Sequence, residues 1–357
     1  MTRPREADAL RGRGASWNPA NRFDGYTYAP DADATTLDDF NGPRPDTQYI
    51  SDRTREVLSR NDSPDVGFDV GLNPYRGCEH GCVYCYARPT HEYLGFSAGL
   101  EFETRILVKH DAPRLLRAAL ARPRWQPQPI AMSGNVDCYQ PAERHFQITR
   151  GCLEVFADTR NPVVIITKNR LVTRDIDLLA RLAEYDAVAV MVSITTLDLE
   201  LNRTLEPRTS SPMQRLDILR QLSAAGIRTG VMVAPVIPGL TDHEAPRILQ
   251  AAAEAGARHA GYVVLRLPHA VAPLMERWLE QHAPLRKERV LSRVRALRGG
   301  RLYDSSFKSR MKGEGVFARQ MANLFDTCAR KAGLSRERVP LNTAAFRRPG
   351  GDQLALF

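Results

Sequence analysis

The stretch that decides the fold is NPYRGCEHGCVYCYARPTHEY, which runs from Asn73 to Tyr93. Three cysteines stand within eight residues of it: Cys78, Cys82 and Cys85. A structural zinc site takes four protein ligands, and a disulfide framework takes an even number of sulfurs. Cubane iron-sulfur clusters normally take four thiolates, one for each iron. The trio therefore indicates either a cluster with one iron left open or a zinc site completed by His80 or His91.

Composition indicates a globular chain with a basic surplus. The 357 residues are 43% hydrophobic and 25% charged, enough for one large α/β domain with extensions. The charged N-terminus lacks a secretory signal and no apolar run is long enough to span a bilayer, so we expect a cytoplasmic protein. A net charge of +9 favours anionic partners such as nucleic acid. In a reducing compartment the remaining cysteines are expected to be thiols: Cys138, Cys152 and Cys328.

Alternating strand and helix patterns predict an α/β fold with a parallel sheet. Strands are expected at 68–72, 130–133, 163–167, 187–194, 229–234 and 262–267, with an extra extended piece at 102–109. Helices are expected at 112–121, 142–158, 174–185, 212–226, 242–256 and 272–282. Thr241 and Glu244 fit a capping box for one of them. The apolar run VAVMVSI implies burial on both faces of the sheet, and six βα repeats fall short of the eight that close a barrel.

Three regions differ in character along the chain. Residues 1–63 are polar and read as an extended arm that wraps a folded body, residues 64–283 as the core, and residues 284–357 as a basic helical extension and tail. RGRGA at 11–15 is the most basic piece of the arm, and it is either solvated or a contact to a cofactor, a phosphate or a partner. The apolar periodicity of residues 315–334 predicts an amphipathic helix.

The motif CxxxCxxC, with Tyr84 before its last cysteine, resembles the signature of the radical S-adenosylmethionine (radical SAM) superfamily. The resemblance implies a partial (β/α)6 TIM-like barrel and a 4Fe-4S cluster held by Cys78, Cys82 and Cys85. It further implies that SAM chelates the fourth iron and is cleaved to methionine and a 5'-deoxyadenosyl radical, which takes a hydrogen atom from a substrate. An electron donor such as flavodoxin or ferredoxin is implied as a partner.

The same resemblance implies that the strand ends bind SAM. The predicted contacts are Tyr84, Gly134, Ser193, Thr195, Arg208 and Val233. Four of them have a structural alternative: a βα turn for Gly134, a helix cap for Ser193 and Thr195, and exposed ion pairs for the charged loop that carries Arg208. A charged residue inside an apolar strand is costly unless it is paired, so Arg266 is expected to contact SAM or the substrate.

NPYRGCEHGCVYCYAR, SGNVDCYQPAE and VAPVIPGL together resemble a bacterial radical SAM group related to the spore photoproduct lyase. This resemblance favours a nucleic-acid substrate, either in photoproduct repair of DNA or in RNA modification. It makes Cys138 a candidate hydrogen donor, against a buried inert thiol. Four tyrosines can stack bases or merely pack: Tyr75, Tyr84, Tyr86 and Tyr139. The alternative function is a zinc- or iron-sulfur-binding protein that binds nucleic acid without radical catalysis.

Overall fold

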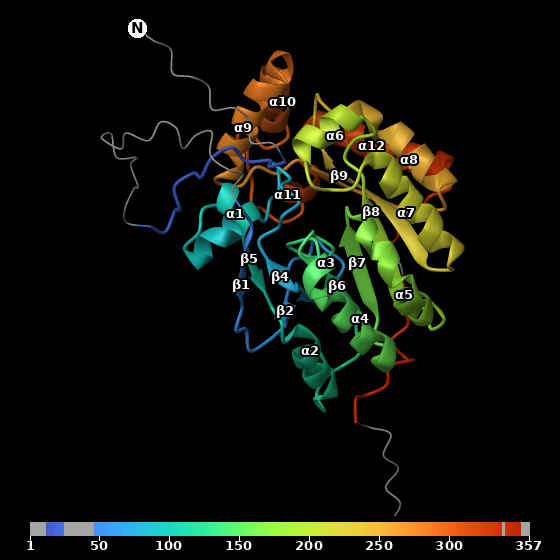
Figure 1. The fold of residues 1–357 in the computed structure, drawn as a ribbon. Coiled ribbons are helices and arrows are strands. Elements are labelled where there is room, and N and C mark those ends of the chain that lie inside the picture. Colours follow the sequence, from blue (N-terminus) through green and yellow to red (C-terminus); the bar gives the residue numbers. More distant parts are fainter. Residues whose placement is uncertain (1–11, 25–45, 338–339, 351–357) are drawn as a thin grey trace, which may run out of the picture.

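The larger of two β-sheets forms the centre of the molecule (Figure 1). The computed structural model describes residues 12–24, 46–337 and 340–350. Six parallel strands and one flanking antiparallel strand, β2, form this sheet. Its order is β10 (His259–Val264), β9 (Arg228–Val236), β8 (Val188–Ser193), β7 (Val163–Thr167), β6 (Ile130–Met132), β3 (Val70–Leu72) and β2 (Leu58–Arg60). The predicted α/β class and its six βα repeats are confirmed, and the sheet is open.

The central strands consist mainly of apolar residues, since they are buried beneath the connecting helices. All residues of β8 except Met191 are buried, as a parallel strand covered on both faces requires. Figure 1 shows the connecting helices arranged along the sheet, with the C-terminal helix α12 beside α8. These helices are α2 (Ala112–Ala121), α4 (Ile148–Thr159), α5 (Ile176–Ala183), α6 (Leu199–Leu205), α7 (Pro212–Ala224), α8 (Ala245–Glu254) and α9 (Val271–His282).

The helix predicted over 142–158 is interrupted. Gln147 has a φ of 52° and separates α3 (Glu143–Phe146) from α4. A non-glycine residue in the left-handed region is uncommon, and no local sequence pattern predicted the break at Gln147. Two other predicted helices open with 3-10 turns, η3 (Arg170–Asp175) before α5 and η4 (Asp242–Glu244) before α8. The sequence pattern thus located these helices but not their first turns.

The capping box predicted at Thr241 and Glu244 is wrong. The Glu244 carboxylate instead accepts hydrogen bonds from Thr196 Oγ1 at 2.6 Å and from the Leu197 amide at 2.7 Å. It therefore ties the start of α8 to the loop after β8. A capping box does occur at the start of α7, where the Ser211 side chain and Gln214 bond each other's backbone amides.

A small second sheet involves the N-terminal region. The piece expected to be extended over 102–109 is helical in its first part, as α1 (Leu100–Thr104), and only then forms β5 (Arg105–Val108). β5 pairs with β1 (Gln48–Ser51) and β4 (Tyr75–Arg76). Within residues 1–63 the described segments 12–24 and 46–63 lie against the body, but β1 and β2 give that region more regular structure than the predicted arm.

The C-terminal extension packs on the core. It contains α10 (Lys287–Ala296), α11 (Ser309–Lys312) and α12 (Gly315–Lys331). The predicted amphipathic helix is confirmed as α12, which buries Phe325 with its ring 4.6 Å from that of Tyr262 on β10. The segment after it runs along the edge of the sheet where the strands begin, with the Asn342 amide bonded to the Asp186 carbonyl at 3.0 Å. In the described ranges no helix is long and apolar enough to cross a bilayer.

Candidate functional site

The cysteine loop lies across the edge of the large sheet where its parallel strands end. It connects β4 to the 3-10 helix η2 (Arg88–Leu94). Backbone hydrogen bonds fix it at intervals: from the Cys78 amide to the Phe102 carbonyl at 2.9 Å, and from the Val83 amide to the Leu205 carbonyl at 3.1 Å. This is the edge at which open α/β sheets bind ligands.

The three thiols of the loop are free. Cys78 is buried, and Cys82 and Cys85 are half-buried. Burial raises the pKa of each thiol, while nearby backbone amides lower the pKa of Cys78 and Cys85. A thiol that stays protonated without metal loses its proton when it binds one, and amides directed at sulfur stabilise the resulting charge. Three soft thiolates on one amide-lined loop fit an iron-sulfur cluster.

The two histidines considered as a fourth zinc ligand, His80 and His91, have other neighbours in the structure. His80 is buried with Nε2 2.9 Å from Asn169 Nδ2 and Nδ1 3.4 Å from Asp137 Oδ2. His91 lies between the rings of Phe96 and Phe102, at 5.3 and 5.5 Å between centroids. Among the described residues, no three or more His, Cys, Asp or Glu side chains are grouped to hold a single ion. The surroundings of His80 and His91 therefore do not favour the zinc alternative.

A buried carboxylate joins the N-terminal arm to the cysteine loop. Glu103 accepts hydrogen bonds from the Gly14 amide at 3.1 Å and the Ala15 amide at 2.8 Å, and pairs with Arg88. Arg88 Nε in turn donates to the Cys82 carbonyl at 3.0 Å. Gly14 lies so close to the loop that a Cβ there would be 1.6 Å from the Gly81 carbonyl oxygen. Within the described part of RGRGA, Gly14 and Ala15 therefore lie against the cysteine loop and are not part of a solvated tail.

A second buried carboxylate holds the other side of the loop. Glu206 accepts hydrogen bonds from the Tyr84 hydroxyl and from Thr195 Oγ1, the latter at 2.7 Å, and pairs with Arg215. Burial raises the pKa of Glu206, and Arg215 opposes that effect. Thr195 Oγ1 also lies 3.0 Å from the Ala234 carbonyl. The hydroxyls of Tyr84 and Thr195, both predicted SAM contacts, therefore have protein partners that join the loop to β8 and β9.

The other predicted SAM contacts lie around the same edge but differ in accessibility. Gly134 follows β6, and a Cβ there would meet only the Phe68 ring, at 3.9 Å. Ser193 ends β8 and is buried, and Val233 on β9 is buried in the core. Arg208 is one-third exposed and pairs with Glu79 of the cysteine loop at 3.0 Å. Arg203, a nearby cation, forms an exposed pair with Glu200 at 2.6 Å.

Two residues of this edge were missed by sequence reasoning. Asp137, in the loop after β6, accepts hydrogen bonds from Thr167 Oγ1 at 2.8 Å and from the Lys168 amide at 2.7 Å. Lys168 directly follows β7, and its ammonium lies 3.4 Å from the Ala234 carbonyl. Its charge is among those that act on Cys82 and Cys85. The available signal was their position after β6 and β7, and the motif TKN at 167–169 marks the second of these positions.

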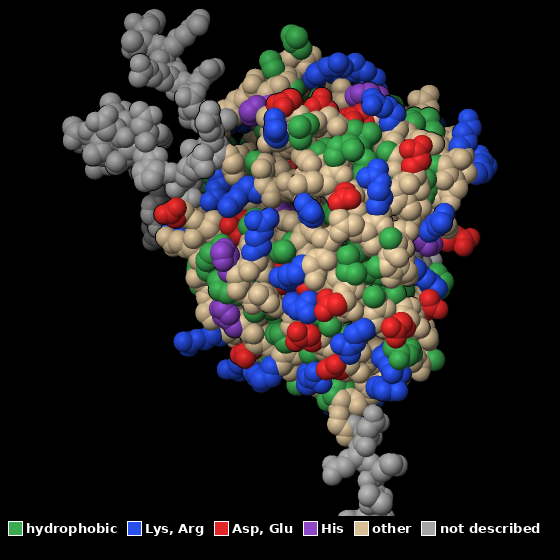
Figure 2. All heavy atoms as spheres, turned by 45° about the vertical axis from the view of Figure 1, so that its right-hand side comes forward, with side chains coloured by type: hydrophobic (Ala, Val, Ile, Leu, Met, Phe, Trp, Pro, Cys, Tyr) green, Lys and Arg blue, Asp and Glu red, His purple; other side chains and the backbone are tan. Residues whose placement is uncertain are grey.

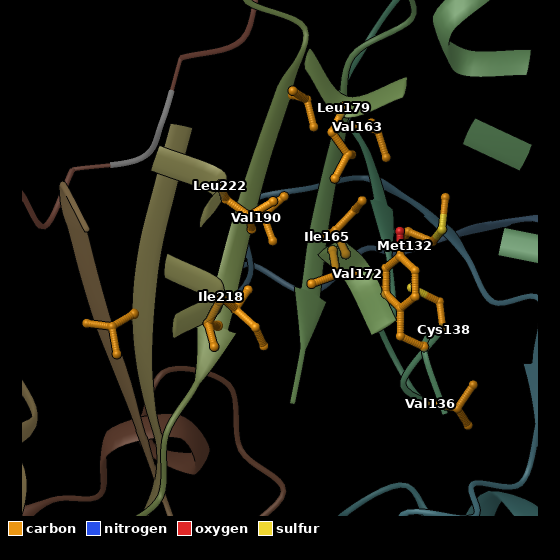
Figure 3. Packing of buried hydrophobic residues seen from close by; sticks show 14 of the residues in the cluster. Met132, Val136, Cys138, Val163, Ile165, Val172, Leu179, Val190, Ile218 and Leu222 are labelled. Atoms are coloured by element: carbon orange, nitrogen blue, oxygen red, sulfur yellow. The ribbon is translucent and has the colours of Figure 1, made fainter. Parts of the chain in front are cut away.

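Cys138 lies in the hydrophobic core, with no exposed surface. Figure 3 shows it among Met132 and Val136, in the same cluster as the strands β6 and β7. Burial raises its thiol pKa well above the usual value, and the carboxylate of Asp137 adds to this. Of the two alternatives for this residue, the position favours the buried inert thiol over the hydrogen donor. Cys152, expected in the core, is also fully buried.

Only one of the four candidate stacking tyrosines is exposed. Tyr75 and Tyr139 are fully buried and donate hydrogen bonds to Glu143 and Asp175. Tyr86 is 43% exposed, and its hydroxyl donates to the Gly134 carbonyl. The guanidinium of Arg266 lies 4.9 Å above its ring.

Comparison with known proteins gives consistent matches. The family model described as "Radical SAM superfamily" matches residues 72–252, just over half of the chain. An uncharacterized protein of Mycobacterium tuberculosis, Rv2578c, is 38% identical over 232 residues, 64% of this chain and 67% of the relative. A radical SAM Nalpha-GlyT isomerase of Pseudomonas phage M6 is 26% identical over 241 residues, 67% and 48% of the two chains. Spore photoproduct lyase complexed with dinucleoside spore photoproduct matches in fold, with a TM-score of 0.54 and 17% identity over 80% of this chain and 78% of the lyase.

Proposed function

The chain belongs to the radical SAM superfamily and is an enzyme of that class; on this premise we propose that Cys78, Cys82 and Cys85 hold a 4Fe-4S cluster. The observation that carries the proposal is the set of three free thiols on one loop fixed across the strand ends. Such a cluster would supply the electron that cleaves SAM, producing the 5'-deoxyadenosyl radical that takes a hydrogen atom from the substrate.

SAM is proposed to bind between the loop and the ends of β6 to β9. Lys168 offers a cation to the methionine carboxylate, and the space above Gly134 allows close approach to backbone. Ser193, Arg208 and the backbone at Val233 are proposed as the further contacts. Tyr84 and Thr195 are proposed to act indirectly, because their hydroxyls hold the loop to Glu206. An electron donor of the flavodoxin or ferredoxin kind is proposed to reduce the cluster.

Nucleic acid is proposed as the substrate class, on the net charge of +9 and the likeness to a lyase that binds a dinucleoside photoproduct. Figure 2 shows lysine and arginine interspersed with acidic side chains on one face of the molecule. The positive charge of that face is therefore not gathered in one broad patch. Recognition is proposed to rest on particular cations close to the site.

Anaerobic reconstitution tests the proposed chemistry. The protein is expected to take up about four irons and four sulfides per chain. With dithionite and SAM it is expected to release methionine and 5'-deoxyadenosine. Stoichiometric zinc binding with no SAM cleavage would contradict the proposal and favour the non-catalytic alternative.

A further inference from the structure

The opening between the two edges of the sheet is bridged by a segment of the C-terminal extension. We call residues 302–312, which include α11, the strap. At the β10 edge Arg298, just before the strap, donates to the Leu265 carbonyl at 3.2 Å and the Ser309 carbonyl at 2.6 Å. Towards the β2–β3 edge, Arg310 of the strap pairs with Asp65 at 2.6 Å. The strap is therefore held both beside the end of β10 and by the connection between β2 and β3.

Arg266 lies under this strap without an acidic partner. Its Nη1 makes only a weak contact with Met311 Sδ, at 3.6 Å, and its Nε is buried with no hydrogen-bond partner. Within the described part of the chain, no carboxylate lies at salt-bridge distance from it. Arg298 nearby is a second cation whose Nε is also unpartnered. A desolvated guanidinium without a counter-charge is costly, so Arg266 calls for an anion from outside.

Arg266 follows a different strand from Lys168, the cation proposed for the SAM carboxylate. Lys168 acts on the thiols from the β7 side, whereas Arg266 follows β10 and stacks on Tyr86, the residue after Cys85. On the strap, the guanidinium of Arg310 lies 4.5 Å over the ring of Phe307, which is 51% exposed. Two arginine–aromatic pairs thus stand at this rim. Such pairs recur where proteins bind single-stranded nucleic acid, since the arginine meets phosphate and the ring stacks on a base.

We propose that Arg266 is a phosphate-binding site for a nucleic-acid substrate and that Phe307 of the strap stacks on one of its bases. The fork of guanidinium N–H groups matches a phosphodiester, which Lys168, a point charge, does not. This inference rests on the proposed function, because it assigns the substrate contacts of the same site. It gives the C-terminal extension a role in substrate recognition.

The test uses cluster-loaded protein, kept anaerobic, and a fluorescein-labelled single-stranded 12-nucleotide thymidine oligomer. Anisotropy titrations at several salt concentrations give the affinity and its salt dependence. Arg266→Gln is expected to weaken binding about tenfold and to reduce the slope of log K against log salt by about 0.7, the value for one phosphate contact. Phe307→Ala is expected to weaken binding about tenfold with the slope unchanged. The matched controls are Arg286→Gln and Leu285→Ala at the exposed turn before α10, which should change neither quantity.

SAM binding and SAM cleavage are measured on the same variants. Unchanged SAM affinity in Arg266→Gln supports the proposal, whereas a fall in SAM affinity with an unchanged salt slope assigns Arg266 to SAM and overturns it. Wild-type protein that cleaves SAM but does not bind the oligomer also overturns it, while leaving the proposed function standing. The urea midpoint of Arg266→Gln should not fall, because the variant removes an unpaired charge. A lowered midpoint would show a structural role instead.

Discussion

Arg88 and Glu103 form an ion pair with both side chains fully buried, 2.5 Å apart between Arg88 Nη2 and Glu103 Oε1. The pair joins three segments, because Arg88 also bonds the Cys82 carbonyl and Glu103 also bonds the amides of Gly14 and Ala15. The cysteine loop therefore has its backbone fixed from the side of the N-terminal arm before any cluster is bound.

Glu103→Gln should destabilise the protein by about 3 kcal/mol, since it leaves the Arg88 charge buried without a counter-charge. Urea unfolding of the cluster-free protein measures this. Asp111→Asn breaks an exposed pair, in which Arg114 Nε lies 3.2 Å from the carboxylate, and is the matched control. Its effect should stay below about 0.5 kcal/mol. Equal effects of the two variants would show that the buried pair does not hold the loop.

Cys85→Ala should abolish assembly of the cluster, because a cubane cannot be held by two thiolates on this loop. Iron and sulfide analysis after reconstitution gives the readout. Cys328→Ala, on the distant helix α12, should keep full iron content. Cluster binding and SAM cleavage that survive in Cys85→Ala would refute the ligand assignment.

The sequence predicted the features that local patterns encode. The spacing of Cys78, Cys82 and Cys85 and the apolar runs of the strands lie within short windows, so the cysteine loop and the six βα repeats could be read directly. Glu103 could not be connected to Gly14, because 89 residues separate them and only the folded chain brings them together. The same reason hid Asp137, whose partners Thr167 and Lys168 lie some thirty residues further on.

Other predictions from the sequence differed from the structure because a residue that suits a local motif or a ligand contact makes a tertiary contact instead. Thr241 and Glu244 have capping-box spacing, but the Glu244 carboxylate is used by the loop after β8, a tertiary contact that overrides the local motif. Tyr84 and Thr195 carry hydroxyls that could contact a ligand, but both hydroxyls donate to the Glu206 carboxylate. Polarity at a strand end thus predicts the edge used by the site but not which side chains face the ligand.

Gly134→Ala should separate the two explanations for this glycine. A Cβ there meets only the Phe68 ring at an ordinary contact distance, so the variant should fold with wild-type stability and iron content. If SAM approaches the backbone at this point, the added methyl group should weaken SAM binding about tenfold, measured by calorimetry on the cluster-loaded protein. Unchanged SAM affinity would leave Gly134 as a turn residue only. Gly14→Ala is the contrasting variant, expected to disturb the loop because its Cβ would clash with the Gly81 carbonyl.

The Cys138 thiol should not react with alkylating reagents in the folded protein. Its pKa is raised well above the usual value by burial, so near pH 8 the thiol stays protonated and is not a nucleophile. Iodoacetamide is expected to alkylate it only after unfolding in urea, as mass spectrometry of the peptide would report. Cys138→Ala is expected to retain SAM cleavage. Rapid alkylation of native protein at this position would instead show the access that a hydrogen donor needs.

His91 should make stability fall in mild acid. It is fully buried, and burial lowers its pKa to about 4, while in the unfolded chain the ring titrates near 6.5. The stabilisation from the neutral ring is complete above about pH 6.5 and is lost as the pH falls toward 4, because only the unfolded chain takes up the proton there. At about pH 5 the loss should be near 2 kcal/mol. Urea unfolding at about pH 7.5 and 5 measures this loss in wild type and in His91→Phe. The loss due to the buried ring should be absent from His91→Phe. His243→Gln, at an exposed histidine, is the control and should behave as wild type. Identical pH profiles for wild type and His91→Phe would mean that the buried ring does not titrate with folding.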